Sequence, residues 1–230
     1  MKNKDAVIIF AKFPEPGKVK TRLSKTIGPD FALEFYRLCA RHTFTECEKL
    51  FPFNVNGYLF YSGNKNKITT KNWTDTEFFL YEQQGKNLGE KMMNAFNIVF
   101  NKDANKAIIV GTDLPDISSD IINHAFTALD TYDVVIGPTN DGGYYLLGLK
   151  KNYCYLFQDI KWSTATVFQD TILRLKNRNL NFKILTLLSD IDTEDDLKSW
   201  LTIKERTGDS IHPMFFSIRK MFRTFNKFDK

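Results

Sequence analysis

The sequence predicts an α/β fold with a mostly parallel central sheet and helices on both faces. Short continuous apolar runs such as AVIIFA (6–11) and AIIVG (107–111) are typical of strands that are covered on both sides. These runs alternate with segments that have helical spacing of apolar residues, which favours parallel strands connected by helices. The chain has 230 residues, 43% of them hydrophobic, and this suffices for the core of one such domain.

The first half of the chain has a clear order of elements. Pro29 suits the first turn of a helix, and Phe31, Phe35 and Cys39 then fall on one face of that helix. The predicted elements are a strand at 6–11, a turn at 13–18, a helix from Pro29 to about Leu50, strands at 54–62 and 77–82, and a helix at 87–100.

The second half continues the alternation. Ser118 or Ser119 can cap one helix, and Thr193 with Asp196 three residues later resembles a capping box for another. The predicted elements are a strand at 107–111, a helix to about Leu129, strands at 133–137 and 144–149, a helix at 165–178, a strand at 182–188, and a helix that ends near Lys204.

Composition narrows the class of protein. The net charge is +5, but the segment from Ile211 onward holds five cations and one anion, so the rest of the chain carries only +1. The globular part therefore does not resemble a nucleic-acid-binding surface. The three cysteines form no CxxC pair, no apolar run reaches about 18 residues, and the N-terminus lacks the layout of a signal peptide. We expect a cytoplasmic protein.

We expect one domain at 1–207 and a basic amphipathic tail or helix at 208–230, because no internal linker is visible. If 214–228 is helical, one side holds Phe215, Ile218, Met221, Phe222, Phe225 and Phe228, and the other holds Arg219, Lys220, Arg223 and Lys227. Such a helix could lie on an anionic membrane as a peripheral contact and reach a lipid-linked acceptor. Docking on its own domain or on a second subunit is at least as good an interpretation, and the oligomeric state stays open.

The loop after the first predicted strand carries a cluster of cations. Loops at the carboxyl ends of strands bind ligands in open α/β sheets, and cations there suit phosphate groups. Gly17 permits close backbone approach and Pro16 stiffens the turn. Lys18 and Arg22 would share a face if Lys18 began a helical turn. We therefore predict that Lys12, Pro16, Gly17, Lys18, Thr21 and Arg22 bind a phosphorylated ligand, which the family resemblance described below implies is a nucleotide; a solvated basic loop is the alternative.

Two carboxylates are candidate ligands of a divalent metal. Asp113 follows the buried strand at 107–111, where a carboxylate can hold a metal that also takes phosphate oxygens. Asp192 ends a later strand and is the candidate second ligand. The alternative is that such residues only stabilise the start of the next helix. We expect Mg²⁺ or Mn²⁺.

The segment N-D-G-G-Y-Y could bind an oxygen-rich ligand. Asp141 would accept hydrogen bonds from hydroxyls, while Gly142 and Gly143 would let backbone amides approach a ligand. A hairpin turn between two strands explains the same residues and is the better interpretation in isolation. Trp162, in W-S-T, is either an acceptor contact or a packing residue.

Together these motifs resemble a known family. In order they are FAKFPEPGKVKTRL, GTDLPD, GPTNDGGYYLLGL, WST and DIDTEDDL, between about Val7 and Leu201. The set is similar to that of the bacterial DUF2064 family, also called the radical-SAM/selenodomain-associated transferase 1 group of glycosyltransferases. The resemblance implies a GT-A-like (Rossmann-like) nucleotide-diphospho-sugar transferase fold. The metal motif here is D-L-P-D rather than D-x-D, so the number of metal-binding carboxylates stays open.

The resemblance also implies a reaction. The leading hypothesis is metal-dependent transfer of a sugar from a nucleotide-diphosphate sugar to a small-molecule or lipid-linked acceptor. Lys18 and Arg22 would offset charge on the leaving diphosphate, and Asp141 would orient the sugar or act as base. The alternative is nucleotidyl transfer from an NTP to a phosphorylated small molecule, with release of pyrophosphate. A third hypothesis is a non-catalytic domain that binds nucleotides.

Overall fold

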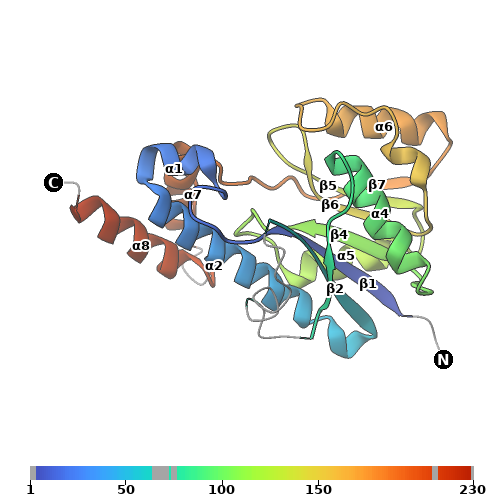
Figure 1. Cartoon of the computed structure of the whole chain (residues 1–230), viewed down its shortest axis with the longest axis horizontal. Helices are drawn as coiled ribbons and strands as arrows, with labels where there is room; N and C mark the ends of the chain where they lie inside the picture. The colour runs from blue at the N-terminus through green and yellow to red at the C-terminus, as the bar shows by residue number, and fades with distance from the viewer. Residues whose placement is uncertain (1–3, 64–72, 74–76, 209–211, 229–230) are drawn as a thin grey trace. The chain divides into compact units, whose positions relative to one another are not determined.

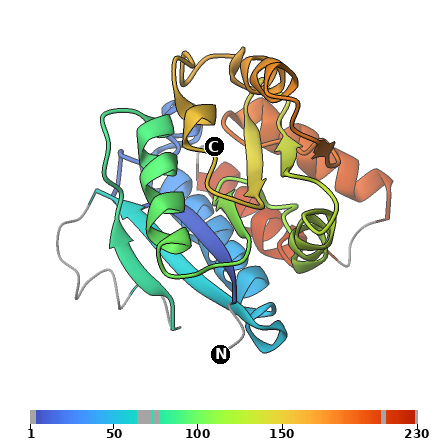
Figure 2. The ribbon, with the colours of Figure 1, turned by 90° about the vertical axis from the view of Figure 1, so that its right-hand side faces the viewer.

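The computed structural model describes residues 4–63, 73, 77–208 and 212–228, and these residues form one mixed, mostly parallel sheet flanked by helices (Figures 1 and 2). The strand order is β3-β2-β1-β4-β6-β5-β7. The strands are β1 (Asp5–Lys12), β2 (Val55–Ser62), β3 (Phe79–Glu82), β4 (Ala107–Gly111), β5 (Val134–Pro138), β6 (Tyr144–Leu149) and β7 (Phe182–Ile184). Only β6, among these strands, runs antiparallel to its neighbours. The predicted α/β class is confirmed.

The centre of the sheet brings the ends of sequence-distant strands to one edge. β1 lies between β2 and β4 and is parallel to both, with Lys12 opposite Ser62 and Phe10 opposite Gly111. β1, β2 and β4 are almost fully buried, as their apolar sequences predict. Because the three strands are parallel, the residues that follow Lys12, Ser62 and Gly111 leave the sheet at the same edge.

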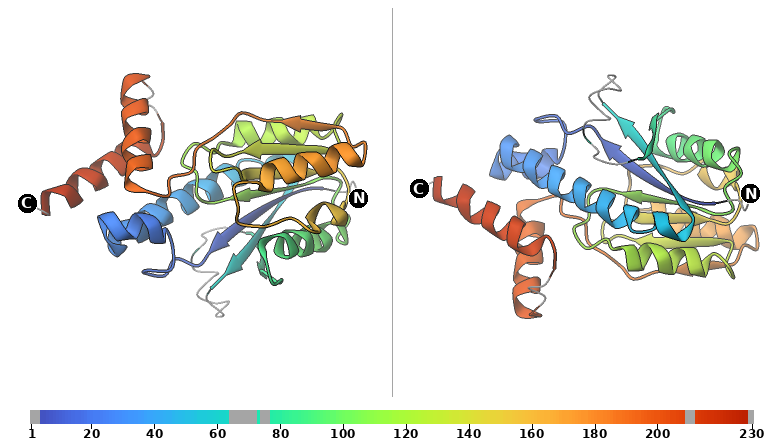
Figure 3. Two further views of the ribbon diagram at one scale, coloured as in Figure 1. Left: turned by 90° about the horizontal axis from the view of Figure 1, so that it is seen from above. Right: turned by 90° about the horizontal axis from the view of Figure 1, so that it is seen from below.

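Helices lie on both faces of the sheet. One face is covered by α4 (Leu88–Phe100), the 3-10 helix η2 (Cys154–Phe157) and α6 (Val167–Asn177), which share a buried apolar core with the strands. The helix α5 (Ser119–Ala128) lies on the opposite face (Figure 3). The side chain of Asn87 caps α4 and that of Ser118 caps α5, as polar residues before an apolar helical pattern should.

The contacts divide the chain into two compact units. Unit 1 comprises 1–13, 43–111 and 116–189 and contains the whole described sheet. Unit 2 comprises 14–42, 112–115 and 190–230. The sequence-based division into 1–207 and 208–230 stays a prediction, but the contacts group the C-terminal segment with the residues of unit 2.

Unit 2 is a small helical assembly with its own core. It contains α1 (Thr21–Ile27), the first part of α2 (Pro29–Glu48), α7 (Glu194–Arg206) and α8 (Phe215–Phe228). Its most deeply buried residues include Leu23, Phe31, Phe35, Leu197 and Ile218. The sequence analysis missed α1, since this helix has seven residues, buries only Leu23 and has no side-chain cap.

The predicted C-terminal helix exists, and its apolar side packs within unit 2. Phe215 and Ile218 are buried, and the rings of Phe222 and Phe225 meet the edge of Phe31 at centroid distances of 6.1 and 5.0 Å. This is the docked arrangement that was the alternative to membrane contact by the apolar side. The side chains of Lys227 and Phe228 lie outside the described residues. No helix in the described part of the chain is long and apolar enough to cross a membrane.

One predicted strand is shorter than expected. The apolar run at 182–188 gives a regular strand only at Phe182–Ile184. Beyond it the chain stays beside β5 through separate contacts, in which the backbone N–H groups of Leu185 and Leu188 donate to the carbonyls of Ile136 and Pro138. The apolar pattern therefore predicted a strand at this position, but it did not predict that regular pairing with β5 ends at Ile184.

Candidate functional site

Lys20 lies between two acidic residues, all three in unit 2. Its Nζ is 2.9 Å from Oδ1 of Asp113 and 3.1 Å from Oδ1 of Asp192. The side chain of Lys20 is only 2% exposed, whereas those of Asp113 and Asp192 are 52% and 39% exposed. One buried ammonium group thus joins two carboxylates that also face solvent. This brings the loop after β1 together with the two predicted metal ligands.

The backbone around Lys20 explains how its side chain is aimed. Lys20 adopts a left-handed conformation (φ 45°, ψ 47°) directly before α1. Few non-glycine residues adopt this conformation, and it persists only where the surroundings hold it. Val19 and Leu23 are buried on either side and anchor the segment. The ammonium group then closes the arrangement by pairing with both carboxylates.

The segments that carry the carboxylates are also anchored. Thr112, next to Asp113, is buried and its hydroxyl is 3.2 Å from that of Tyr36 on α2. Asp192 precedes Thr193, the N-cap of α7, and its backbone N–H donates to Asp196 at 3.1 Å. The predicted capping box of Thr193 and Asp196 is confirmed. Both carboxylates therefore sit on ordered backbone beside Lys20.

Electrostatics keep Lys20 charged. Burial alone would lower the pKa of Lys20, but the nearby carboxylates of Asp113 and Asp192 outweigh it and raise that pKa above its ordinary value. Arg22 adds a second cation, with Nη1 3.8 Å from Oδ2 of Asp192. Its side chain is 71% exposed. A pair this open contributes little to stability, so the guanidinium can turn to an anionic ligand at small cost.

The other predicted nucleotide-binding residues are more exposed to solvent than Lys20. Lys18 is exposed and forms an ion pair with Glu15. Lys18 and Arg22 would share a helical face only if Lys18 began a helical turn, and this condition is not met because α1 begins at Thr21. Gly17 has φ +71°, with open space where a side chain would start. Pro16 and Thr21 are exposed in unit 2, whereas Lys12 is exposed at the end of β1 in unit 1.

Asp141 shapes a turn in unit 1. Its Oδ1 accepts hydrogen bonds from the Thr139 hydroxyl (2.6 Å) and from the backbone N–H of Gly143 (2.9 Å). Gly142 has φ +86°, and a Cβ there would lie 2.0 Å from the carbonyl oxygen of Ala165. These residues form the turn between the antiparallel strands β5 and β6, which was the alternative interpretation. Their binding of a sugar or acceptor stays a prediction.

Trp162, also in unit 1, packs against the start of α4. A Cβ on Gly89 would lie 2.1 Å from Nε1 of its indole ring, so only glycine lets the indole approach so closely. The ring also stacks near Phe157, with centroids 6.3 Å apart. These contacts hold the W-S-T segment to the fold, and an acceptor role for Trp162 is untested.

The two carboxylates beside Lys20 fit a metal site that is completed by a phosphorylated ligand. Among the residues that the structure describes, no group of three or more His, Cys, Asp or Glu side chains could enclose a metal ion. Asp113 and Asp192 nevertheless offer part-exposed carboxylate oxygens, the ligands that Mg²⁺ and Mn²⁺ prefer. Mg²⁺ is commonly held by one or two carboxylates together with phosphate oxygens and waters. The residues therefore fit a metal that is bound jointly with a phosphorylated ligand.

Lys20 is the residue that motif reasoning left out of the site. It lies in the cationic loop, but the sequence motifs do not assign it to binding. Its position between the apolar residues Val19 and Leu23 is the signal that could have distinguished it, because a lysine in a buried stretch needs an acidic partner.

Solved structures place this fold in a class that contains nucleotide-diphospho-sugar transferases and cytidylyltransferases. A protein from Desulfovibrio desulfuricans G20, described as a candidate nucleotide-diphospho-sugar transferase, is 28% identical with a TM-score of 0.89, and 98% of each chain is covered. Two others show the fold alone. Inositol-1-phosphate CTP transferase from T. maritima is 14% identical with a TM-score of 0.55, and the match covers 86% of this chain and 93% of that chain. 4-diphosphocytidyl-2C-methyl-D-erythritol synthase from Anaerococcus prevotii DSM 20548 is 10% identical with a TM-score of 0.57, and the match covers 86% of this chain and 99% of that chain.

The model of the family described as "Uncharacterized protein conserved in bacteria (DUF2064)" matches residues 52–164 of this chain. The family that the motifs predicted is thereby confirmed. The matched part includes Asp113, the turn at 141–143 and Trp162, whereas the cationic loop and Asp192 lie outside it. No curated protein matches this sequence.

Proposed function

We propose that this protein is a glycosyltransferase that moves a sugar from a nucleotide-diphosphate sugar to an acceptor with the help of a divalent metal. The observation that carries the proposal is the cluster in which Lys20 joins Asp113 and Asp192, with Arg22 beside it. Carboxylates and cations in one place suit a metal–diphosphate complex, because the carboxylates hold the metal and the cations meet phosphate oxygens. The likeness to the D. desulfuricans protein supports a transferase of this class.

Each residue of the cluster has a role in the proposal. Arg22 is exposed and would turn to the phosphates, and Lys18 on the same loop adds a second exposed cation. Negative charge grows on the diphosphate as it leaves the sugar, so these cations bind the transition state more strongly than the ground state. Lys20 is buried and fixed, and its role is to hold the two carboxylates at a set separation.

Mg²⁺ or Mn²⁺ would be held by Asp113 and Asp192 and would neutralise the diphosphate as it leaves. Because Lys20 already pairs with both carboxylates, Asp113 and Asp192 would hold the metal only together with oxygens of the phosphorylated ligand. The protein groups alone are a weak site, and metal and nucleotide should bind cooperatively.

Nucleotidyl transfer is the second candidate. One solved structure of the same fold is named an inositol-1-phosphate CTP transferase and another is a synthetase in complex with CTP, and the same cluster would suit a triphosphate. In that reaction the acceptor phosphate attacks the α-phosphorus and pyrophosphate leaves. The two reactions therefore differ in their released product.

Two measurements test the proposal. Thermal unfolding is followed with a panel of nucleotides and nucleotide sugars, each with and without Mg²⁺ or Mn²⁺; a ligand at about 100 times its Kd adds roughly 2.7 kcal/mol to the unfolding free energy. Products made from the stabilising ligand are then identified. A released nucleoside diphosphate supports glycosyl transfer. Pyrophosphate without a nucleoside diphosphate overturns it in favour of nucleotidyl transfer, and binding without turnover by a range of acceptors argues for a non-catalytic nucleotide-binding protein.

A further inference from the structure

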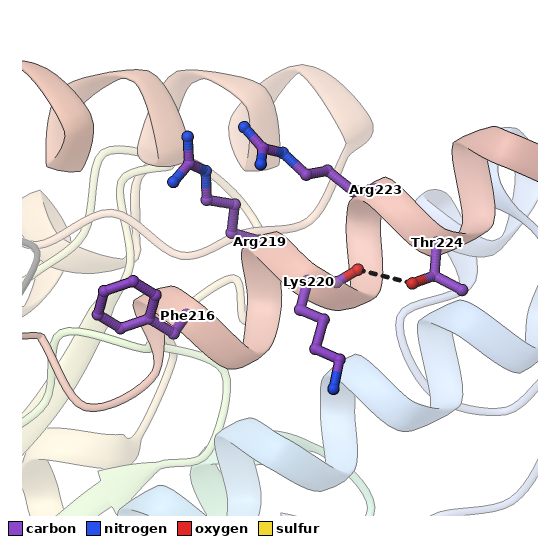
Figure 4. Close-up of a pocket in the computed structure, with 5 residues that line it drawn as sticks. All are labelled: Phe216, Arg219, Lys220, Arg223 and Thr224. Carbon is purple, nitrogen blue, oxygen red and sulfur yellow. Dashed lines mark hydrogen bonds between the residues drawn. The ribbon is translucent and has the colours of Figure 1, made fainter.

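We propose that the exposed side of α8 docks on the surface of an anionic phospholipid membrane. This α8 basic face consists of Phe216, Arg219, Lys220 and Arg223, and Thr224 completes its hollow (Figure 4). The inference does not depend on the reaction that the protein catalyses. It also differs from membrane contact by the apolar side of α8, because that side is packed in the core of unit 2.

The cations of the α8 basic face spread to both sides of the helix. Arg219 and Arg223, one turn apart, point to the same side in Figure 4, and Lys220 points to the other. The two arginines also line a groove of about 600 Å³ with Lys198, Thr202 and the acidic Glu205 of α7. Phosphate groups in the plane of a membrane could meet guanidinium groups in this groove and the ammonium of Lys220 beyond it.

The charged residues of this helix are all positive. The sequence from 215 to 228 contains four cations and no acidic residue, and the segment from Ile211 onward accounts for +4 of the net charge of +5. Some of the neighbouring charge is balanced within unit 2, since Glu205 pairs with Arg219 at 2.8 Å and Glu194 with Lys198 at 2.7 Å. The helix as a whole still presents an excess of positive charge, which complements an anionic surface.

Phe216 favours a lipid surface over a soluble anion as the partner. Its side chain is 62% exposed beside the cations, although most aromatic residues of α8 are packed inward. An exposed aromatic ring next to lysine and arginine can enter the boundary between head groups and acyl chains while the cations contact lipid phosphates. A free phosphate would gain nothing from the ring.

Vesicle co-sedimentation of the full-length protein tests this inference. We expect binding to vesicles of phosphatidylcholine with 30% phosphatidylserine, little binding to pure phosphatidylcholine, and release as salt is raised. The triple variant R219Q/K220Q/R223Q should bind about 100-fold more weakly, because each cation near an anionic surface contributes roughly a fivefold factor. Phe216→Ser should weaken binding at high salt, where the cations are screened.

A matched control removes the same charge elsewhere. Lys102, Lys151 and Lys176 are exposed in unit 1, and their replacement by glutamine should leave vesicle binding within a factor of three. The unfolding temperature of each variant shows that it is folded. Equal sedimentation of the native protein and the α8 triple variant overturns the inference, as does equal loss in both triple variants. A dimer in solution that the α8 substitutions dissociate would assign the face to a second copy of the chain and also overturn it.

Discussion

The ammonium group of Lys20 lies 2.9 Å from Oδ1 of Asp113, which joins the loop after the first strand to the loop after the fourth. Lys20 is almost fully buried there and has Asp192 as a second partner at 3.1 Å. A buried ammonium needs such partners, because losing its hydration without compensation costs several kcal/mol. The cluster is therefore part of the folding of unit 2 as well as a candidate site.

Lys20→Met should lower the unfolding free energy by about 1–2 kcal/mol, less than the 3–5 kcal/mol of a fully buried pair, because the two carboxylates stay partly hydrated. Denaturant unfolding at pH 7 measures the change. In the background of Asp113→Asn with Asp192→Asn the sign should reverse, and Lys20→Met should stabilise, since it removes a buried ammonium that has lost both carboxylates. Destabilisation of similar size in both backgrounds would show that Lys20 does not act through these carboxylates.

Arg22→Gln should leave the stability of the fold almost unchanged but weaken nucleotide binding. With a side chain that is 71% exposed, Arg22 contributes little to folding, so the unfolding temperature without ligand should change by less than about 2 °C. The stabilisation by the best nucleotide ligand should fall, with a Kd raised roughly tenfold, because a charged hydrogen bond to phosphate contributes about 1.5–3 kcal/mol. The exposed Lys25→Gln on the same helix is the control. If nucleotide affinity is the same in Arg22→Gln and Lys25→Gln, Arg22 does not contact the phosphates.

Much of the fold follows from the sequence, because the central strands are continuous apolar runs and α4, α5 and α7 begin at capping side chains. The sequence could not show that Lys20, rather than Lys18, is the cation that pairs with the carboxylates. That choice depends on the left-handed backbone at Lys20 and on the start of α1 at Thr21. The helix α1 itself is too short and too polar for periodicity to reveal it. Asp113 could be placed at the edge of the sheet because it follows the buried strand β4, whereas Asp192 lies eight residues after the end of β7, so the expectation that it ends a strand is wrong.

Gly142→Ala should be strongly destabilising and Gly17→Ala only mildly so. Both glycines have positive φ, which costs an alanine about 1 kcal/mol. At Gly142 the new Cβ would also lie 2.0 Å from the backbone oxygen of Ala165, whereas at Gly17 it would meet no atom within 4 Å. The unfolding temperature should therefore fall by several degrees more for Gly142→Ala than for Gly17→Ala. Equal losses would mean that the β5–β6 turn shifts freely away from Ala165.

Glu46 provides a test of acid stability within unit 1. Its buried carboxylate accepts hydrogen bonds from Lys49 Nζ (2.7 Å) and from the backbone N–H of Ser119 at the start of α5 (2.9 Å). Burial alone would raise the pKa of Glu46, but these hydrogen bonds outweigh it and hold the pKa below the ordinary value of 4.5. The charged form therefore stabilises the fold above pH 4.5, and this contribution is lost as the pH falls through the depressed pKa of the folded protein.

Glu46→Gln should accordingly lower the unfolding free energy by about 1–2 kcal/mol at pH 7, because a hydrogen bond to a charged group becomes one to a neutral amide. The difference between the native protein and the variant should shrink steadily below pH 4.5, since protonation makes the native side chain neutral as well. Glu48→Gln, two residues away on α2 at a half-buried position, should show a difference of less than 0.5 kcal/mol at every pH. Denaturant unfolding between pH 3 and 7 measures all three proteins. A Glu46→Gln difference that is constant across this range would show that the lost stability comes from packing and not from the charge at the start of α5.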